Sequence, residues 1–131
     1  MRPDKAGKPS SFSVQSRLKS FSFALAGFRH LVRVEHNARV HLVATLAAIA
    51  VSAALQISLA DWRWIVLAIA LVWIAESVNT AIEALCDLVS PGFNDAIRIA
   101  KDVSAGGVLV ASIAALLIGS ATIWPYLLVT V

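Results

Sequence analysis

The sequence contains a single cysteine, Cys86, and few charged residues. One cysteine excludes a disulfide within the chain, and no Cys/His spacing resembles a zinc site, so we expect a packed free thiol. Charged residues make up 15% of the sequence, whereas an average soluble domain has roughly 25%. Hydrophobic residues reach 59%. This composition predicts a small all-α membrane protein.

Basic residues are scarce outside the N-terminal region. Eight of the eleven lysines and arginines lie before position 40, and the others are Arg63, Arg98 and Lys101. The basic region lacks the interleaved aromatic residues typical of base stacking, so we expect it to face anionic lipid and predict no nucleic-acid partner. Residues 1–11 are expected to be a disordered basic tail before one domain over 12–131. A cleavable signal peptide is not expected, because the first apolar run begins only near Val40.

Three apolar runs are long enough to cross a bilayer, which takes about 20 residues in a helix. They predict spans at about 40–60, 64–86 and 103–125. Basic residues precede the first span and lie in the predicted 87–102 loop, whereas Arg63 stands alone between spans one and two. By the positive-inside rule, the N-terminus and the 87–102 loop face the cytoplasm.

A further helix is predicted over about 12–36, ahead of the first span. Its apolar residues recur at alternating steps of four and three, and they are Val14, Leu18, Phe21, Leu25, Phe28 and Val32. This spacing favours an amphipathic helix lying in the cytoplasmic interface. A helix that packs on the chain's own spans, with no role beyond anchoring, is the alternative.

The second span carries a polar stripe that an apolar helix does not need. At 100° per residue its members fall within a sector of about 100°, and they are Glu76, Asn79, Thr80, Glu83 and Asp87. An acidic residue at the centre of a span costs about 2.5–3.5 kcal/mol on insertion scales. Polar contacts between helices could explain Asn79 or Thr80. Three acids in register instead indicate that a divalent metal, a transported cation or protons visit the stripe.

Lys101 and Asp102 stand at the predicted entry to the third span. A lysine beside carboxylates at a membrane surface suits a nucleotide phosphate with bound Mg²⁺, although an ordinary solvated helix start would look the same. The chain has no Walker A motif and no glycine-rich kinase loop. The three histidines do not share a helical face, so we expect no metal site from them. Glu35 lies where the first helix meets span one and could face Glu83.

Together these segments resemble the prokaryotic diacylglycerol kinase family, which includes the undecaprenol kinases. The resemblance runs over roughly residues 20–119 and rests on "AESVNTAIEALCDLV" and "RIAKDVSAGGVLVASI", with "AGFRH" and "VEHNARVHL" before them. It implies a homotrimer of three-span subunits in the bacterial inner membrane, which phosphorylates a lipid hydroxyl with ATP and Mg²⁺. The segment "VEHNARVHL" looks more like the undecaprenol kinase branch.

The resemblance also implies roles for individual residues. Glu76 matches the catalytic base, and Glu35 and Glu83 match the metal-binding acids. The remaining matches are Lys101 and Asp102 as the nucleotide-binding pair, Phe93 and Asn94 in a loop that often reads aromatic-His, Arg17 or Lys19 as an early basic residue, and Asn79 and Asp87 as residues lining the site. Two other classes stay open at this point: a proton- or cation-coupled transporter using the Glu76 stripe, and a non-catalytic scaffold.

Overall fold

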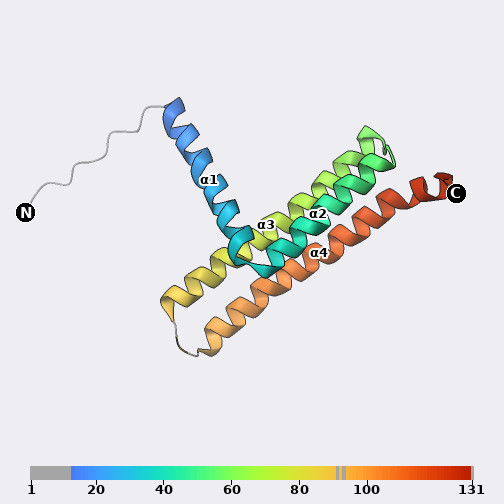
Figure 1. Ribbon diagram of the computed structural model, residues 1–131. Coiled ribbons are helices and arrows are strands. Elements are labelled where there is room, and N and C mark those ends of the chain that lie inside the picture. Colours follow the sequence, from blue (N-terminus) through green and yellow to red (C-terminus); the bar gives the residue numbers. More distant parts are fainter. Residues whose placement is uncertain (1–12, 91, 93, 131) are drawn as a thin grey trace, which may run out of the picture.

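The computed structural model describes residues 13–90, 92 and 94–130, which form four helices. They are α1 (Val14–Val34), α2 (His36–Ala54), α3 (Leu59–Val89) and α4 (Asp95–Thr130). Helices α2, α3 and α4 lie side by side in alternating directions, and α1 leaves this bundle at an angle, near the middle of α3 (Figure 1). The tail predicted for residues 1–11 lies outside the described residues.

Local capping explains where the helices begin. The Ser13 hydroxyl accepts a hydrogen bond from the Ser16 N–H at the start of α1, and the Ser58 hydroxyl accepts one from the Asp61 N–H at the start of α3. The Asn94 side-chain oxygen accepts from the Ala96 N–H at 2.9 Å and so begins α4. Helix α2 follows α1 after one extended residue, Glu35, with φ −86° and ψ 125°. The chain therefore changes direction at Glu35.

Three helices are long and apolar enough to cross a membrane: α2, α3 and residues 95–128 of α4. Only 11%, 28% and 6% of their most apolar windows are buried within the chain. Because so little of this apolar surface is covered internally, lipid or other protein must cover the rest. The predicted spans at 64–86 and 103–125 each lie within one helix, whereas the predicted span at 40–60 runs past the end of α2 at Ala54 and into the start of α3.

The helix bounds differ from the predicted spans. Helices α3 and α4 both continue beyond the apolar runs, so the connection between them is residues 90–94, not the predicted 87–102 loop. Asp87, Lys101 and Asp102 consequently lie on helices. Hydropathy marks where a bilayer can begin, but a helix satisfies its own backbone hydrogen bonds in water as well as in lipid. Pro125 also lies inside α4.

Helix α3 is the centre of the bundle. Its buried side chains share one face and are Ile65, Ala68, Val72, Glu76, Asn79 and Cys86. Cys86 is a buried free thiol, as predicted. Two of these buried residues are polar, so the core of the bundle contains part of the predicted stripe.

Helix α1 contacts the bundle only through its last turns among the described residues. Phe28 packs against Trp73 of α3 with ring centroids 4.6 Å apart, and Leu31 is buried. The Trp73 indole N–H in turn donates to the Thr45 hydroxyl of α2 at 3.0 Å. The earlier apolar residues of α1 stay exposed, at 67% for Leu18 and 81% for Phe21.

A polar cluster joins α3 and α4 at the opposite end of the bundle. The Tyr126 hydroxyl accepts from the Ser58 N–H at 2.9 Å and donates to the Asp61 carboxylate at 2.5 Å. Ser58 and Asp61 form the first turn of α3, so Tyr126 connects the end of α4 to the turn that follows α2.

Replacing Tyr126 with Phe is expected to lower the free energy of unfolding by about 1 kcal/mol, because the Ser58 N–H and the Asp61 carboxylate each lose a partner. Unfolding in detergent micelles measures the change. Thr122→Val is the matched control, since the Thr122 hydroxyl donates to the Ile118 carbonyl of its own helix at 2.8 Å. Equal losses in the two variants would contradict a role for Tyr126 in joining the helices.

Candidate functional site

The polar stripe of α3 faces α4 at Asn79. The Asn79 amide nitrogen donates to Glu83 at 3.0 Å, one turn along the same helix. The Ser104 hydroxyl of α4 donates to the Asn79 amide oxygen at 2.6 Å. Asn79 is only 6% exposed, so this short chain of hydrogen bonds fixes the side chain of Glu83 from inside the bundle.

Glu76 is the most deeply buried acid in the described residues. Its side chain is 1% exposed, and its Oε2 atom has no hydrogen-bond partner. The nearest basic group is the His41 imidazole of α2, whose Nε2 atom lies 3.9 Å from Oε2. This distance is too long for a hydrogen bond, although it allows charge attraction when the histidine is protonated. A carboxylate oxygen without a partner in an apolar core is costly, which is typical of functional sites.

Sequence reasoning missed the contact between His41 and Glu76. The three histidines were compared with one another as metal ligands, whereas this contact joins two helices. A usable signal was present in α2, where the residues at 38, 41, 45, 48 and 52 recur at steps of three and four. Ala38 and Ser52 in this series are fully buried, and Thr45 accepts a hydrogen bond from Trp73 of α3. The series places His41 on the face of α2 that packs on the stripe.

Lys101 and Asp102, the predicted nucleotide-binding pair, form ion pairs with different helices. Lys101 of α4 reaches across to Asp87 of α3, with Nζ and Oδ1 2.5 Å apart. It also interacts electrostatically with Glu83. Asp102 instead bonds Arg98 on its own helix at 2.9 Å. The Lys101 side chain therefore contacts the stripe of α3, whereas Asp102 is exposed and pairs within α4.

Glu35 lies at the junction between α1 and α2. Both Glu35 and Glu83 are close enough to Glu76 to interact with it electrostatically. The three acids do not form a complete metal site, because the described part of the chain contains no group of three His, Cys, Asp or Glu side chains able to hold an ion.

The described residues among the remaining predictions lie at the starts of helices. Asn94 caps α4, and Arg17 is exposed near the start of α1. Phe93 lies outside the described residues. The nucleotide-binding roles of Arg17, Asn94 and Phe93 stay predictions.

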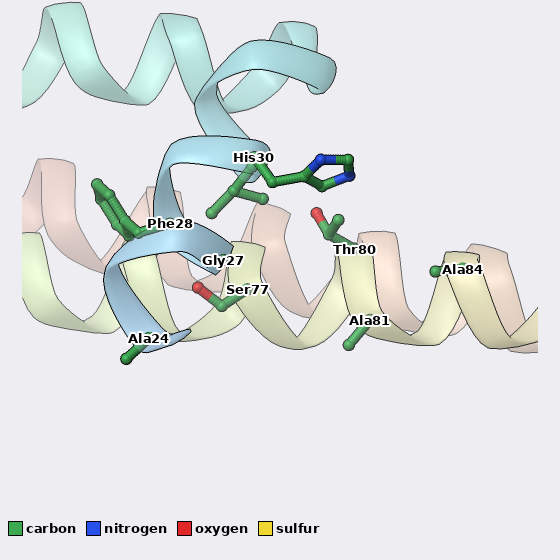
Figure 2. Close-up of a pocket in the computed structure, with 9 residues that line it drawn as sticks. Ala24, Gly27, Phe28, His30, Ser77, Thr80, Ala81 and Ala84 are labelled. Carbon is green, nitrogen blue, oxygen red and sulfur yellow. The ribbon is translucent and has the colours of Figure 1, made fainter. Parts of the chain in front are cut away.

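Three cavities lie along α3, and the first and third of them are lined in part by stripe residues. The first, about 440 Å³, lies between α1 and α3; Figure 2 shows Gly27, Phe28 and His30 on α1 and Ser77, Thr80 and Ala84 on α3. The second, about 300 Å³, lies between α2, α3 and α4. The third, about 260 Å³, is more polar and is lined by residues that include Asn37, Asn79 and Glu83. His41 and Ser112 line both the second and the third cavity.

Comparison with known proteins identifies the family. Residues 22–123 match the family model described as prokaryotic diacylglycerol kinase. The match covers most of the sequence, including α2, α3 and the residues of the polar stripe. The chain belongs to the prokaryotic diacylglycerol kinase family.

Two curated relatives are similar over most of this chain. A "Diacylglycerol kinase" of Synechocystis sp. is 36% identical over 112 residues, which is 85% of this chain and 64% of the relative. An "Undecaprenol kinase" of Bacillus subtilis is 33% identical over 101 residues, which is 77% of this chain and 82% of the relative. The chain thus spans less than two thirds of the length of the Synechocystis protein.

Replacing Glu76 with Gln is expected to raise the free energy of unfolding by about 1 kcal/mol, because an amide of the same shape removes a buried charge whose Oε2 atom has no partner. Unfolding in detergent micelles tests this. Glu83→Gln is the matched control and is expected to change stability less, since Glu83 is less buried and accepts from Asn79. A clear loss of stability in Glu76→Gln would favour the scaffold interpretation, in which Glu76 holds helices together.

Proposed function

We propose that this protein is a membrane lipid kinase, which transfers the γ-phosphate of ATP to the hydroxyl of a lipid alcohol. The observation that carries the proposal is the buried Glu76 carboxylate, with one oxygen unpartnered, in a helix able to span a membrane. Family membership and the kinase names of both relatives support it. They do not favour the transporter alternative.

Glu76 is the proposed general base. A base must reach the lipid hydroxyl, and that hydroxyl sits just below the headgroup level. Glu76 is seven residues before Glu83 and eleven before Asp87 on α3, or about 10 and 16 Å at 1.5 Å per residue. Its free Oε2 atom can accept the hydroxyl proton while the lipid oxygen attacks the γ-phosphorus and ADP leaves. His41 lies 3.9 Å from this same Oε2 atom and attracts the carboxylate when its imidazole is protonated.

Glu83 and Glu35 fit the proposed magnesium site. Mg²⁺ in phosphoryl-transfer sites takes one or two carboxylates and completes its coordination with water and substrate phosphates. Two separated acids near Glu76 match that requirement, and the oxygen donors are of the right kind. When bound with ATP, the ion would neutralise charge on the phosphates. Asn79 and Ser104 hold the Glu83 side chain in place for it.

Lys101 is the proposed contact for the nucleotide phosphates. Its ammonium group is already among acids, with Asp87 bonded to it and Glu83 nearby. An incoming phosphate can replace Asp87 as its partner, and the lysine then balances the charge of the donor. Asp102, with Arg17, Asn94 and Phe93, is proposed to complete the nucleotide site.

The membrane placement follows from the distribution of charge. Arg33, Arg39, Arg98 and Lys101 lie near the α1–α2 and α3–α4 connections, whereas Arg63 lies near the opposite end of the bundle. We therefore place those two connections on the cytoplasmic side of the bacterial inner membrane. The exposed apolar residues of α1 favour a helix lying in the interface. The weakly buried spans are consistent with assembly of the protein as a homotrimer.

Glu76→Gln is expected to lower the rate of ATP-dependent lipid phosphorylation by at least about 100-fold, because general-base catalysis contributes roughly that factor. The assay uses diacylglycerol and undecaprenol separately in mixed micelles with Mg²⁺, since the names of the two relatives divide between these lipids. Asp95→Asn is the matched control, because Asp95 is an exposed acid paired with Arg98. A folded parent protein that phosphorylates neither lipid would overturn the proposed activity.

Lys101→Met is expected to raise the KM for ATP by about tenfold while leaving the KM for lipid nearly unchanged, because one charge-assisted contact to phosphate is lost. Steady-state kinetics with each substrate varied in turn measures both values. Arg98→Met, one turn earlier on α4, is expected to change neither by more than about twofold. If both variants raised the KM for ATP equally, general surface charge would explain the effect.

A further inference from the structure

The 300 Å³ cavity between α2, α3 and α4 has an apolar lining, and the proposed reaction assigns no ligand to it. Small or apolar side chains line it on all three helices, and they are Ala44, Thr45 and Ala48 of α2, Ala68, Ile69 and Val72 of α3, and Ala115 and Leu116 of α4. The Thr45 hydroxyl is already bonded to Trp73. We refer to this cavity as the three-helix groove. Its walls suit a hydrocarbon chain.

One end of the three-helix groove meets the candidate site. His41 and Ser112 line both the groove and the polar cavity that contains Asn79 and Glu83. His41 is also the residue 3.9 Å from the unpartnered Oε2 atom of Glu76. The buried, unpartnered oxygen of Glu76 therefore lies next to a residue at the polar end of the apolar groove. An amphiphile with one hydroxyl has this distribution of polar and apolar groups.

The groove also runs in the direction that a membrane lipid requires. From His41 it follows α2 to Ala48, α4 from Ser112 to Leu116, and α3 back from Val72 to Ala68. All three directions lead away from the α3–α4 connection (Figure 1). Ala68 lies eight residues before Glu76, or about 12 Å farther from that connection.

The larger cavity beneath α1 lies on the wrong side of Glu76 for a lipid tail. Its α3 residues are Ser77, Thr80, Ala81 and Ala84, which all follow Glu76 along α3 toward the α3–α4 connection. A chain bound there would extend from the hydroxyl toward the polar end of the bundle. The three-helix groove instead extends toward the middle of the apolar helices.

The geometry points to the three-helix groove as the binding site for the hydrocarbon chain of the lipid alcohol, with the hydroxyl at Glu76 and His41. This inference rests on the proposed kinase function and adds the position of the tail. Only a long chain then contacts Ala48, Ala68 and Ala115, the small residues that line the groove beyond His41 and Ser112. A short alcohol can reach Glu76 without contacting them.

Filling the groove tests the inference. In Ala48→Leu the added side chain is expected to lower kcat/KM for undecaprenol by about tenfold, because an overpacked site excludes the chain. The kcat/KM for dimethylallyl alcohol, a single isoprene unit, should change by less than about twofold. Ala81→Leu fills the cavity beneath α1 by the same volume and should leave both alcohols unaffected. Ala115→Leu narrows the groove from α4 and should reproduce the Ala48→Leu pattern.

The kinetic outcomes separate the possible tail sites. The inference is overturned if Ala81→Leu lowers kcat/KM for undecaprenol selectively and the groove variants do not. The tail would then bind in the cavity beneath α1. An equal fall in kcat/KM for both alcohols in both folded groove variants would also overturn it. Such a fall would show that the substitutions disturb Glu76 and not the binding of the tail.

A binding experiment without ATP keeps the inference separate from the proposed activity. The intact protein in lipid nanodiscs is irradiated with a prenol that carries a photoreactive diazirine in its chain, and the labelled peptides are identified. Labelling of α2 residues 44–48 and α4 residues 112–116, reduced in Ala48→Leu, is the expected result. Labelling confined to other surfaces overturns the groove assignment, including the case in which another copy of the chain fills it. Absence of lipid phosphorylation in the parent would instead refute the kinase function.

Discussion

The structure depends on the burial of one carboxylate between apolar helices. Glu76 is buried in the interior of the bundle, where α2 brings His41 to 3.9 Å from the acid. A single charged group in such surroundings costs free energy that packing elsewhere must offset. Polar contacts through Asn79 and Ser104 continue from this point toward the α3–α4 connection.

The order of polar groups along α3 matches the two phases in which the proposed substrates reside. The exposed pair of Asp87 and Lys101 lies at the end near the connection, Glu83 follows, and Glu76 is deepest. A water-soluble phosphoryl donor and a membrane-embedded acceptor would meet between these levels. Phosphoryl transfer needs positioning and charge neutralisation more than a covalent intermediate, so a few side chains on straight helices are sufficient for the proposed chemistry.

A membrane protein of this size cannot bury most of its apolar surface within one chain. The buried face is largely that of α3, while α1 projects from the bundle with Leu18 and Phe21 exposed. Lipid replaces much of the hydrophobic core that a soluble domain would need. Small side chains such as Ala48 and Ala115 line the cavity that remains between the three helices.

Hydropathy and periodicity by themselves determined the all-helical class, the three spans and the acids at Glu76, Glu83 and Asp87, because these features depend on local composition and helical spacing. The helix ends were placed less well, since capping by Asn94 extends α4 into the predicted loop. Only the tertiary structure decided that Lys101 pairs with Asp87, that Asp102 turns to Arg98, and that His41 faces Glu76. Those contacts join different helices or choose between neighbouring partners, and helix rotation and approach distance are set by packing, which spacing along one chain does not encode.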